Sequence, residues 1–543
     1  MAISQFSAGP LRRRIAFSRT LPPETTRIFK ERGYECYLLE AAKLEEPDEI
    51  ATTDSVVLTQ TLENPQDIRK DLQRLAHVLD HGCCLYVRYV PSPSAQEIIL
   101  KALNTFFLPP SGFATEDVKF FDKSWFEGAH SPVFAPFVHI LIANDDWHSL
   151  ANLIASNPAG IPPNPELTID ISDASHQKVV LSEDQELLLR RAFWKCTSVK
   201  LLGKANGLSG VGTYEAFADI TGNVVGSGWP YRYFVKLGSR LKIAREYEKY
   251  RMTALQNVPY HLGPRLRLDR CVLGRSQGVI VSDYVSGAEV LRDCARDGRG
   301  IPAISNLFNV TLLPWRRAAR EEGRPLQETL LELLERKVPE HRQSLITTCG
   351  ATKTLDELKS IFRSASPSQP VLTGVIHNDL HATNVLVRMN DAVIIDLESI
   401  QNSGPLLIDA ASLEGGLFVD GFIKDRRCAA DILLSLQSLY DLAAFERDDH
   451  HCHPVDGSAW FIDSVRQIRM QARQMERQTY QYAWTLAYVL LRKACNTEDF
   501  REDAEVSTLD SRPLTRETCR ALAYVVAERI LIALSKQGEQ PPK

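Results

Sequence analysis

Acidic, amide and imidazole side chains are crowded into HNDLHATN, residues 377–384, between two apolar runs. The runs GVI and VLV on either side are typical of short strands, and DAVIID, which follows a turn, is typical of a third strand. A loop that is held by strands on both sides is a place where a fold positions chemical groups. The oxygen-bearing side chains available there are Asp379, Asn384 and Asp396.

These three side chains suit the transfer of a phosphoryl group, which depends on positioning and charge neutralisation more than on covalent chemistry. Asp379, at the start of the loop, can orient an acceptor hydroxyl and accept its proton. Asn384, later in the loop, and Asp396, after the next strand, can supply oxygen ligands to Mg²⁺. The sequence therefore predicts a metal-phosphate site, which also needs a lysine to steady the nucleotide.

The motif HNDLHATNVLV followed by VIIDLE resembles HGDLHxxNxLV and xIDxE, the signatures of the aminoglycoside phosphotransferase and choline kinase-like family. That family has a protein-kinase-like fold. The resemblance implies that Asp379 is the catalytic base and that Asn384 and Asp396 are the magnesium ligands. It also makes Glu398 the acid of the family's Asp-x-Glu, which replaces the Asp-Phe-Gly of protein kinases.

The segment GPLLIDAASLE, residues 404–414, resembles the segment that follows in the same family. By this resemblance Asp409 would brace the catalytic loop, residues 377–384, from behind without a direct catalytic role. The two histidines of the loop, His377 and His381, are expected to hold it by hydrogen bonds to backbone and not to bind a metal.

A lysine lies upstream of the motif, in the order that the family requires. Lys236 ends the predicted strand YFVKL, where it would contact the phosphates. Its acidic partner is expected in the next helix, where Glu246 and Glu248 are both available. We favour Glu246, because it precedes Tyr250 by one turn on the apolar side of this helix.

Two further segments complete the predicted nucleotide site. NGLSGVG, residues 206–212, would form the turn over the phosphates, because glycine lets backbone N–H groups approach closely. SDYV, residues 282–285, would be the hinge that presents backbone groups to adenine. The residues expected to bind ATP are thus Lys236, Glu246, Gly207, Ser209, Gly210, Asp283 and Val285.

Two positions depart from the family's pattern. Asn378 replaces the usual Gly of HGD, and Leu397 replaces the usual Phe. Neither change removes a functional group, so activity is expected to be retained. The pattern GP…D-x-A-x-LE, and the closeness of the lysine to the helix, also resemble, more faintly, ternary-complex-associated kinase-like domains of bacterial conflict systems.

The length of the chain predicts two or three domains. Residues 1–156 alternate apolar runs with helix-like stretches, which predicts an α/β domain with an open, mostly parallel sheet of the flavodoxin or receiver type. Residues 157–182, rich in Pro, Asn and Ser, are predicted to be a linker in which LTIDI could add a last strand. Residues 183–285 are expected to form a five-stranded lobe with one helix, which is predicted at 240–256, and one of the strands is predicted at 264–273. Residues 286–543 are expected to form a mostly helical lobe. The predicted fold class is an α+β two-lobed protein-kinase-like domain after a small α/β domain.

The strands predicted for the N-terminal domain are RRIAF, ECYLLE, DSVVLTQ, CCLYVRYV and FVHILIA. A phosphoacceptor receiver would carry acids after the first strand and at the end of the third. Ser18-Arg19 and Thr59-Gln60 occupy those places. We therefore expect a docking module without a phosphoacceptor, through which the chain could bind a protein partner.

The composition of the chain limits the classes of binding partner and the cellular compartment that we expect. A net charge of −5 and a pI near 6.3 argue against a nucleic-acid or anionic-membrane surface. No apolar run approaches the length of a membrane span, and no signal-peptide core follows the N-terminal arginines. The eleven cysteines form no CxxC pair, which favours reduced thiols in the cytoplasm.

Three other stretches are predicted to be structural. DDHHCHP, residues 448–454, is more typical of a polar surface loop than of a metal site, because its neighbouring side chains cannot all turn toward one ion. RQIRMQARQMERQ, residues 466–478, is predicted to be a solvated basic helix face. YAWTLAYVLLRKA, residues 482–494, is predicted to be a core helix of the large lobe.

Together these features predict an ATP- and Mg²⁺-dependent phosphotransferase that transfers the γ-phosphate to a hydroxyl of a small molecule or a protein. The alternative is a non-catalytic nucleotide sensor, a pseudokinase in a bacterial signalling or defence complex. Phosphate transfer by the purified protein would distinguish the two.

Overall fold

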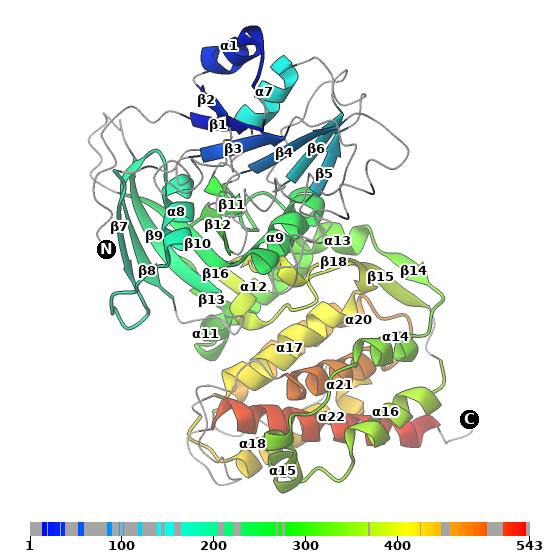
Figure 1. The fold of residues 1–543 in the computed structure, drawn as a ribbon. Coiled ribbons are helices and arrows are strands. Elements are labelled where there is room, and N and C mark those ends of the chain that lie inside the picture. The colour runs from blue at the N-terminus through cyan, green and yellow to red at the C-terminus, as the bar shows by residue number, and fades with distance from the viewer. Residues whose placement is uncertain are drawn as a thin grey trace. The chain divides into compact units, whose positions relative to one another are not determined.

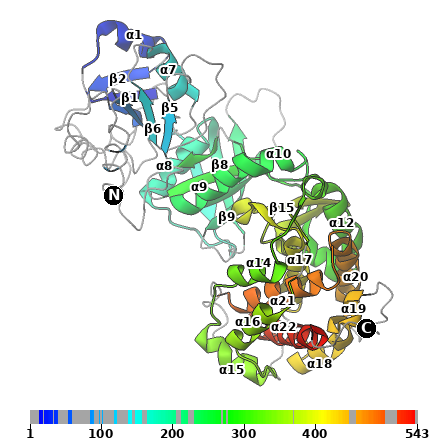
Figure 2. The same cartoon turned by 90° about the vertical axis from the view of Figure 1, so that its right-hand side faces the viewer.

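The structure, a computed structural model, divides the chain into two compact units. The first comprises residues 1–248 and 265–284, and the second comprises residues 249–264 and 285–543 (Figures 1 and 2). The residues that the structure describes are 13–18, 20–32, 34–38, 53–58, 84–89, 97, 101, 118–121, 138–142, 147–156, 164, 166–204, 211–220, 230–267, 270–273, 277–367, 370–423, 425–446, 457–496 and 514–538.

The first unit contains a six-stranded, wholly parallel sheet in the order β2-β1-β3-β4-β6-β5. Its strands are β1 (Arg13–Phe17), β2 (Tyr34–Leu38), β3 (Thr53–Leu58), β4 (Cys84–Tyr89), β5 (Val118–Phe121) and β6 (Val138–Ile142). Side chains of three strands, Ile15, Val57 and Tyr86, pack with Phe29 of α1 (Pro23–Glu31) and Leu150 of α7 (Trp147–Ser156). Helices on a parallel sheet bury its apolar strands in this way.

The five strands predicted for this domain are all present, and the predicted parallel pairing is confirmed. The sixth strand, β5, was not predicted, because its four residues VKFF are too few to show a period of two. The flavodoxin or receiver type stays a prediction. Of the positions that argued against a phosphoacceptor, Ser18 follows β1, whereas Arg19, Thr59 and Gln60 lie outside the described residues.

A second sheet of the first unit has the order β11-β12-β10-β9-β8-β7. Its strands are β7 (Thr168–Ser172), β8 (Cys196–Gly203), β9 (Gly212–Ile220), β10 (Tyr231–Ser239), β11 (Val272–Leu273) and β12 (Gln277–Asp283). All pairs are antiparallel except β7 with β8. The core on one face includes Val235 and Leu237 of β10, so the residue between them, Lys236, points to the opposite face.

Two predictions for this lobe were wrong in part. The segment LTIDI, placed in the linker 157–182, forms β7 and extends the lobe to six strands, because Leu167 and Ile171 are buried in its core. Its parallel pairing with β8 is possible because α8 (Glu183–Ala192) provides the crossover, starting at a Ser182–Gln185 capping box. The strand predicted at 264–273 is only the two-residue β11, with an isolated bridge from Leu266 to Ser282.

The predicted helix 240–256 is present as α9 (Arg240–Lys249), a π-helical turn at Tyr250–Ala254 and α10 (Leu255–Asn257). Within the first unit, Ile243 and Tyr247 of α9 pack with Val211, Cys271 and Ile280 in a small core. Glu246 lies on the same helix, directly before Tyr247.

The second unit is mostly helical, as predicted. Its main helices are α11 (Leu291–Arg296), α12 (Gly300–Asn306), α13 (Leu313–Arg317), α14 (Leu326–Leu333), α15 (Glu340–Thr348), α16 (Leu355–Ser364), α17 (Leu407–Gly421), α18 (Ala429–Ser435), α19 (Ala443–Glu446), α20 (Ala459–Arg473), α21 (Gln481–Ala494) and α22 (Arg516–Gly538). Two small sheets accompany them. They contain β13 (Glu289–Val290), β16 (Val385–Arg388) and β17 (Asp391–Ile394), and β14 (Arg320–Glu322), β15 (Val371–Ile376) and β18 (Gln401–Pro405).

Helix α17 is the centre of the second unit, and it packs against α20, α21 and α22 (Figure 1). Its Glu414 is buried and accepts hydrogen bonds from Arg469 of α20, at 2.7 and 3.1 Å, and from the hydroxyl of Tyr482. The prediction that 466–478 is a solvated basic face was therefore wrong at Arg469, whose guanidinium is held inside by Glu414. Arg466, on the same helix, is exposed as predicted.

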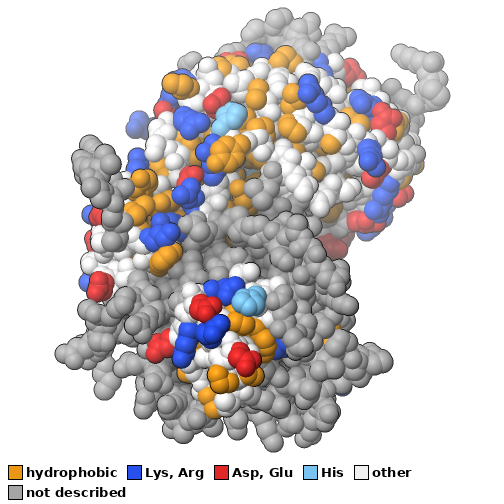
Figure 3. Space-filling model, turned by 90° about the horizontal axis from the view of Figure 1, so that it is seen from above, with side chains coloured by type: hydrophobic (Ala, Val, Ile, Leu, Met, Phe, Trp, Pro, Cys, Tyr) orange, Lys and Arg blue, Asp and Glu red, His pale blue; other side chains and the backbone are white. Residues whose placement is uncertain are grey.

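On the face drawn in Figure 3, the described side chains mix acidic, basic and apolar groups. Among the described residues, no helix is long and apolar enough to cross a membrane. The stretch 448–454, predicted to be a polar loop, lies outside the described residues.

Candidate active site

The catalytic loop connects β15 to β16 in the second unit, and Asp409 of α17 holds it from one side. The Asp409 carboxylate is buried and accepts hydrogen bonds from the backbone N–H groups of His377 and Asn378, both at 2.9 Å. Burial raises the pKa of Asp409 to about 6, although these hydrogen bonds and the neighbouring His377 oppose the shift. One side chain of α17 thus fixes the backbone at the start of the loop.

The loop is also tied to the segment that carries Asp396. The Nε2 atom of His377 donates to the carbonyl oxygen of Ile395 at 2.9 Å. The backbone N–H of Ile395 donates to the carbonyl oxygen of Asn384, also at 2.9 Å. Because both ends of the loop bind Ile395, the positions of Asn384 and Asp396 depend on each other. Glu398 follows in a 3₁₀ turn, Leu397–Ser399.

The side chain of Asn384 is oriented by the loop itself. Its Nδ2 atom donates to the backbone carbonyl of Asp379 at 3.0 Å, and the same carbonyl accepts from the N–H of His381. Since the amide nitrogen is engaged, Oδ1 is the atom of Asn384 suited to bind a cation. The hydroxyl of Thr383 hydrogen-bonds Nδ1 of His381 at 2.6 Å.

Two residues of the site have a left-handed backbone, Asn378 with φ 63° and Asp396 with φ 61°. Glycine adopts this conformation most easily, and Asn and Asp are the next most tolerant residues. Asn378, which stands where the motif that it resembles has Gly, therefore has a backbone conformation that Gly adopts most easily. Arg492 of α21 holds it further by donating to its carbonyl oxygen at 2.8 Å and to its Oδ1 at 3.1 Å.

The carboxylate of Asp379 is 44% exposed, and Nε2 of His381 lies 3.7 Å from its Oδ2. Burial of the surrounding site would raise the pKa of Asp379, but nearby positive charges outweigh it and hold the pKa below its usual value. These charges belong to His381, Lys493, Arg492 and His377. Burial lowers the pKa of His381, although the carboxylate of Asp379 opposes this shift. Asp379 is thus ionised and accessible, as a group that accepts a proton must be.

In the first unit, Lys236 of β10 donates to both carboxylate oxygens of Glu246 of α9, each at 2.8 Å. Their side chains are only 11% and 12% exposed. The ion pair therefore involves Glu246, the glutamate that the helix pattern favoured, while nothing is described of the Glu248 side chain. A role of the pair in binding nucleotide stays a prediction.

Of the remaining residues that were predicted to bind the nucleotide, the structure describes only Asp283 and Val285. Asp283 ends β12, where its N–H donates to the carbonyl of Arg265 and its Oδ1 lies 3.7 Å from Nε of Arg267. The chain passes from the first unit to the second between Tyr284 and Val285. Gly207, Ser209 and Gly210, predicted to form the turn over the phosphates, lie outside the described residues.

Two residues at the end of α21 lie at the site although the sequence did not indicate it. Arg492 binds the loop and Lys493 acts on Asp379, but both ended a stretch interpreted as a core helix. The only signal was a pair of adjacent cations, RK, that interrupts an apolar pattern. Their role depends on the loop, which lies more than a hundred residues earlier in the chain, as the separation of 114 between Arg492 and Asn378 shows.

Several solved structures are similar to this chain, whereas no protein-family model and no curated protein matches it. The aminoglycoside phosphotransferase APH(4)-Ia is 11% identical, with 64% of this chain and 97% of that chain covered and a TM-score of 0.33. A glucosamine kinase in complex with glucosamine, ADP and inorganic phosphate is 12% identical, with coverage of 58% and 81% and a TM-score of 0.31. An ethanolamine kinase from Plasmodium vivax is 10% identical, with coverage of 61% and 81% and a TM-score of 0.30.

Aminoglycoside phosphotransferases and an ethanolamine kinase, the kinds of enzyme that the sequence motif resembles, are thus among the similar structures.

Proposed function

We propose that this chain is an ATP- and Mg²⁺-dependent phosphotransferase with a protein-kinase-like fold, which transfers the γ-phosphate to a hydroxyl of a small molecule or a protein. The observation that carries the proposal is the geometry of the catalytic loop. Asp409 fixes the loop, Asp379 is ionised and accessible on it, and the amide of Asn384 is oriented by a hydrogen bond to Asp379. A loop that only capped its own turns would not need an ionised, half-exposed carboxylate within a set of fixed oxygens.

Asn384 and Asp396 fit a magnesium ion that shares its coordination with phosphates. Both offer hard oxygens, and the loop fixes the amide so that Oδ1 is the suitable atom of Asn384. An ion held by these two protein oxygens would complete its coordination with phosphate oxygens and water. When bound, the ion would neutralise charge on the phosphates. Glu398 would assist from the following turn.

In the reaction, Asp379 would orient the acceptor hydroxyl and take its proton. The hydroxyl oxygen then forms a bond to the γ-phosphorus, the bond from that phosphorus to the β–γ bridging oxygen breaks, and ADP leaves with the electron pair. Lys236, held by Glu246, would neutralise charge on the phosphates. The turn with Gly207, Ser209 and Gly210 would cover the phosphates, and Asp283 and Val285 would present backbone groups to adenine.

The domain organisation and cytoplasmic location predicted from the sequence form part of this proposal. Residues 1–156 would be a flavodoxin- or receiver-like docking module that recruits a protein partner, followed by a kinase-like domain. The parallel sheet supports an α/β module. Residues 183–285 would form the smaller lobe of the kinase-like domain and residues 286–543 the larger lobe.

The test is phosphate transfer by the purified full-length chain. With γ-labelled ATP and Mg²⁺, we expect label to appear on one or more alcohols, sugars, amino alcohols or hydroxylated proteins in a panel. ATP binding measured in parallel by calorimetry provides the control. Binding of ATP without transfer to any acceptor, and without ATP hydrolysis, would contradict the enzyme and favour the nucleotide sensor.

A further inference from the structure

Lys493 lies beside the catalytic loop. It is the penultimate residue of α21, and its side chain runs along α17, with Cδ 3.5 Å from the place where a Cβ on Gly415 would lie. The next glycine of α17, Gly416, faces the loop, because a Cβ there would lie 2.6 Å from Cβ of His381. The stem of Lys493 and the loop residue His381 therefore rest against two adjacent glycines of one helix.

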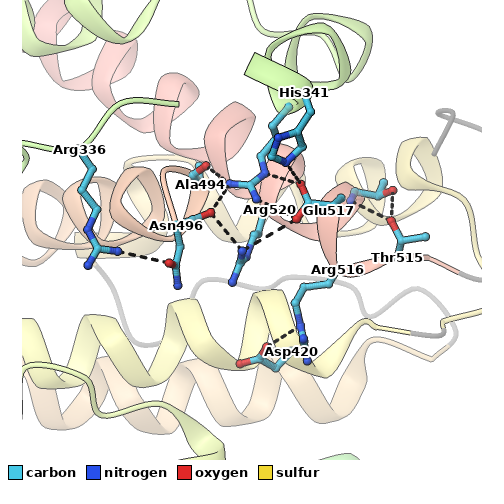
Figure 4. A network of polar contacts seen from close by, with 11 residues as sticks. Arg336, His341, Asp420, Ala494, Asn496, Thr515, Arg516, Glu517 and Arg520 are labelled. Atoms are coloured by element: carbon cyan, nitrogen blue, oxygen red, sulfur yellow. Dashed lines mark hydrogen bonds and ion pairs between the residues drawn. The ribbon is translucent and has the colours of Figure 1, made fainter. Parts of the chain in front are cut away.

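The arginines around Lys493 have partners, whereas its own ammonium has none that the structure describes. The pairs are Arg492 with Asn378, Arg520 with Asn496, and Arg516 with Asp420, of which Figure 4 shows the last two. Within the described part of the chain, the ammonium of Lys493 forms no hydrogen bond and no ion pair. Lys493 is partly buried. A partly buried ammonium without a partner is unfavourable, and an anionic ligand that pairs with it would stabilise it.

The electrostatic surroundings of Lys493 point to the acceptor and not to ATP. Burial lowers the pKa of Lys493, and the carboxylates that oppose this shift are those of Asp379 and Asp420. The proposed function assigns the phosphates of ATP to Lys236 and to the magnesium ligands, and the acceptor hydroxyl to Asp379. The geometry agrees, because Arg492, the residue before Lys493, hydrogen-bonds Asn378, the residue before Asp379. Lys493 is therefore a neighbour of the acceptor.

We propose that Lys493 binds an anionic group of the acceptor, a carboxylate or a phosphate, close to the hydroxyl that Asp379 orients. The proposal rests on the phosphotransferase function and narrows its acceptors to hydroxylated acids. Hydrogen bonds between an ammonium and a carboxylate or phosphate are strong because both partners are charged. Arg492 and Arg520 also act on Lys493 as positive charges. They would partly offset the repulsion between a bound anion and the nearby carboxylates of Asp379 and Asp420.

A matched set of acceptors tests the proposal. Glycerol, glycerate and glycerol 3-phosphate share a pair of hydroxyl groups on adjacent carbons. They differ at the third carbon, which carries a hydroxyl, forms a carboxylate or carries a phosphate. Phosphate transfer to each would be measured as kcat and KM in wild type and in three variants. Lys493→Met removes the charge and keeps the stem, Lys493→Arg keeps a charge, and Lys536→Met at the exposed end of α22 is the matched control.

We expect wild type to prefer an acid to glycerol, and the preferred acid distinguishes a carboxylate site from a phosphate site. In Lys493→Met the ratio of kcat/KM for the acid to that for glycerol should fall by about tenfold to a hundredfold, mainly through KM, because a charged hydrogen bond is lost. Lys493→Arg should retain part of the preference, so the test does not depend on how well the methionine variant folds. Lys536→Met should keep all of it.

Three results would overturn the proposal, and they show whether only the role of Lys493 fails or the proposed function fails as well. If wild type transfers phosphate but does not favour the acids, or if Lys493→Met keeps the preference with an unchanged melting temperature, only the role of Lys493 fails. If wild type transfers phosphate to none of these acceptors and to no larger hydroxy acid or alcohol, the proposed function fails and this proposal fails with it.

Discussion

The side-chain amide of Asn384 donates a hydrogen bond to the backbone carbonyl of Asp379 at 3.0 Å. The residue proposed to bind magnesium and the residue proposed to act as base are therefore joined through the backbone of one loop. A change at Asn384 would disturb both roles. Changes to the Asp379 and Asp396 side chains leave this hydrogen bond in place, so those positions can separate catalysis from nucleotide binding.

Asp379→Asn should bind ATP nearly as well as wild type and lose phosphate transfer by about 10² to 10⁴-fold, because the general base is removed while the loop is kept. Calorimetry with ATP and Mg²⁺, together with transfer of labelled phosphate, would measure the two effects. Transfer at the wild-type rate would exclude Asp379 as the base. A cellular phenotype that persists in this variant would favour the nucleotide sensor.

Asp396→Asn should lose Mg²⁺-dependent ATP binding and keep the fold, because a carboxylate ligand is replaced by a weaker amide ligand. Calorimetry with and without Mg²⁺ would detect the loss. Asp391→Asn is the matched control, since Asp391 begins the strand β17 and its side chain is about half exposed. Equal Mg²⁺-dependent affinities in the two variants would refute the assignment of Asp396.

Lys236→Met should reduce turnover by orders of magnitude, and it should also destabilise the protein. Lys236 and Glu246 form a largely buried ion pair, and removal of one partner leaves a poorly solvated charge. Glu246→Gln added to Lys236→Met should restore part of the stability. Urea unfolding of the two single variants and the double variant would measure this coupling.

Glu248→Gln is the control for this pair and should change little. A larger loss of turnover in Glu248→Gln than in Glu246→Gln would contradict the functional importance of the ion pair that the structure shows.

Arg469→Met should lower the free energy of unfolding by about 3–5 kcal/mol, because the carboxylate of Glu414 is fully buried and would lose its cationic partner. Urea unfolding would test this expectation. Arg466→Met, on the exposed face of the same helix, should change stability by less than about 0.5 kcal/mol. Similar stabilities of the two variants would show that the buried pair contributes little.

Activity should fall as the pH is lowered through about 6. The pKa of Asp409 is raised to about 6 by burial, so at lower pH its carboxyl gains a proton and can no longer accept both N–H bonds of the loop. The pKa of Asp379 is held below its usual value, so Asp379 is still ionised in this range. A pH–rate profile of wild type and Asp409→Asn would test the assignment, since the variant should lack the limb near pH 6.

The contribution of Asp409 to stability should have the opposite dependence on pH. Its folded-state pKa lies above its unfolded value, so the folded state binds the proton more tightly between these two values. This contribution is therefore present below the unfolded pKa and is lost as the pH rises through about 6. Urea unfolding of wild type and Asp409→Asn on both sides of pH 6 would reveal it, and parallel pH dependences in the two proteins would contradict it.

The catalytic loop could be predicted from the sequence because its chemistry and its flanking strands are local. The polar residues from His377 to Asp396 lie within twenty consecutive residues, so their order is visible in a short stretch of sequence. In the structure, hydrogen bonds connect them to one another. The pairing of Lys236 with Glu246 also follows from a strand and the helix directly after it.

Features that depend on distant contacts were not predictable. Arg469 looked like a surface residue because its partner Glu414 lies on another helix, 55 residues away. The strand β7 looked like a part of the linker because only its packing in the second sheet reveals its place. The roles of Arg492 and Lys493 likewise depend on the distant catalytic loop. Arg492 hydrogen-bonds Asn378, and the charge of Lys493 lowers the pKa of Asp379.

The two adjacent glycines of α17 also limit how the sequence can vary. A methyl group at position 416 would press on His381 at 2.6 Å, so any side chain there would displace the loop that carries Asp379. Gly323, by contrast, has open space around it. In a library of random variants selected for activity, position 416 should stay glycine while position 323 drifts freely. The absence of a side chain at position 416 thus allows α17 to contact the loop. The frequency of substitutions recovered at this position would show whether activity requires that contact.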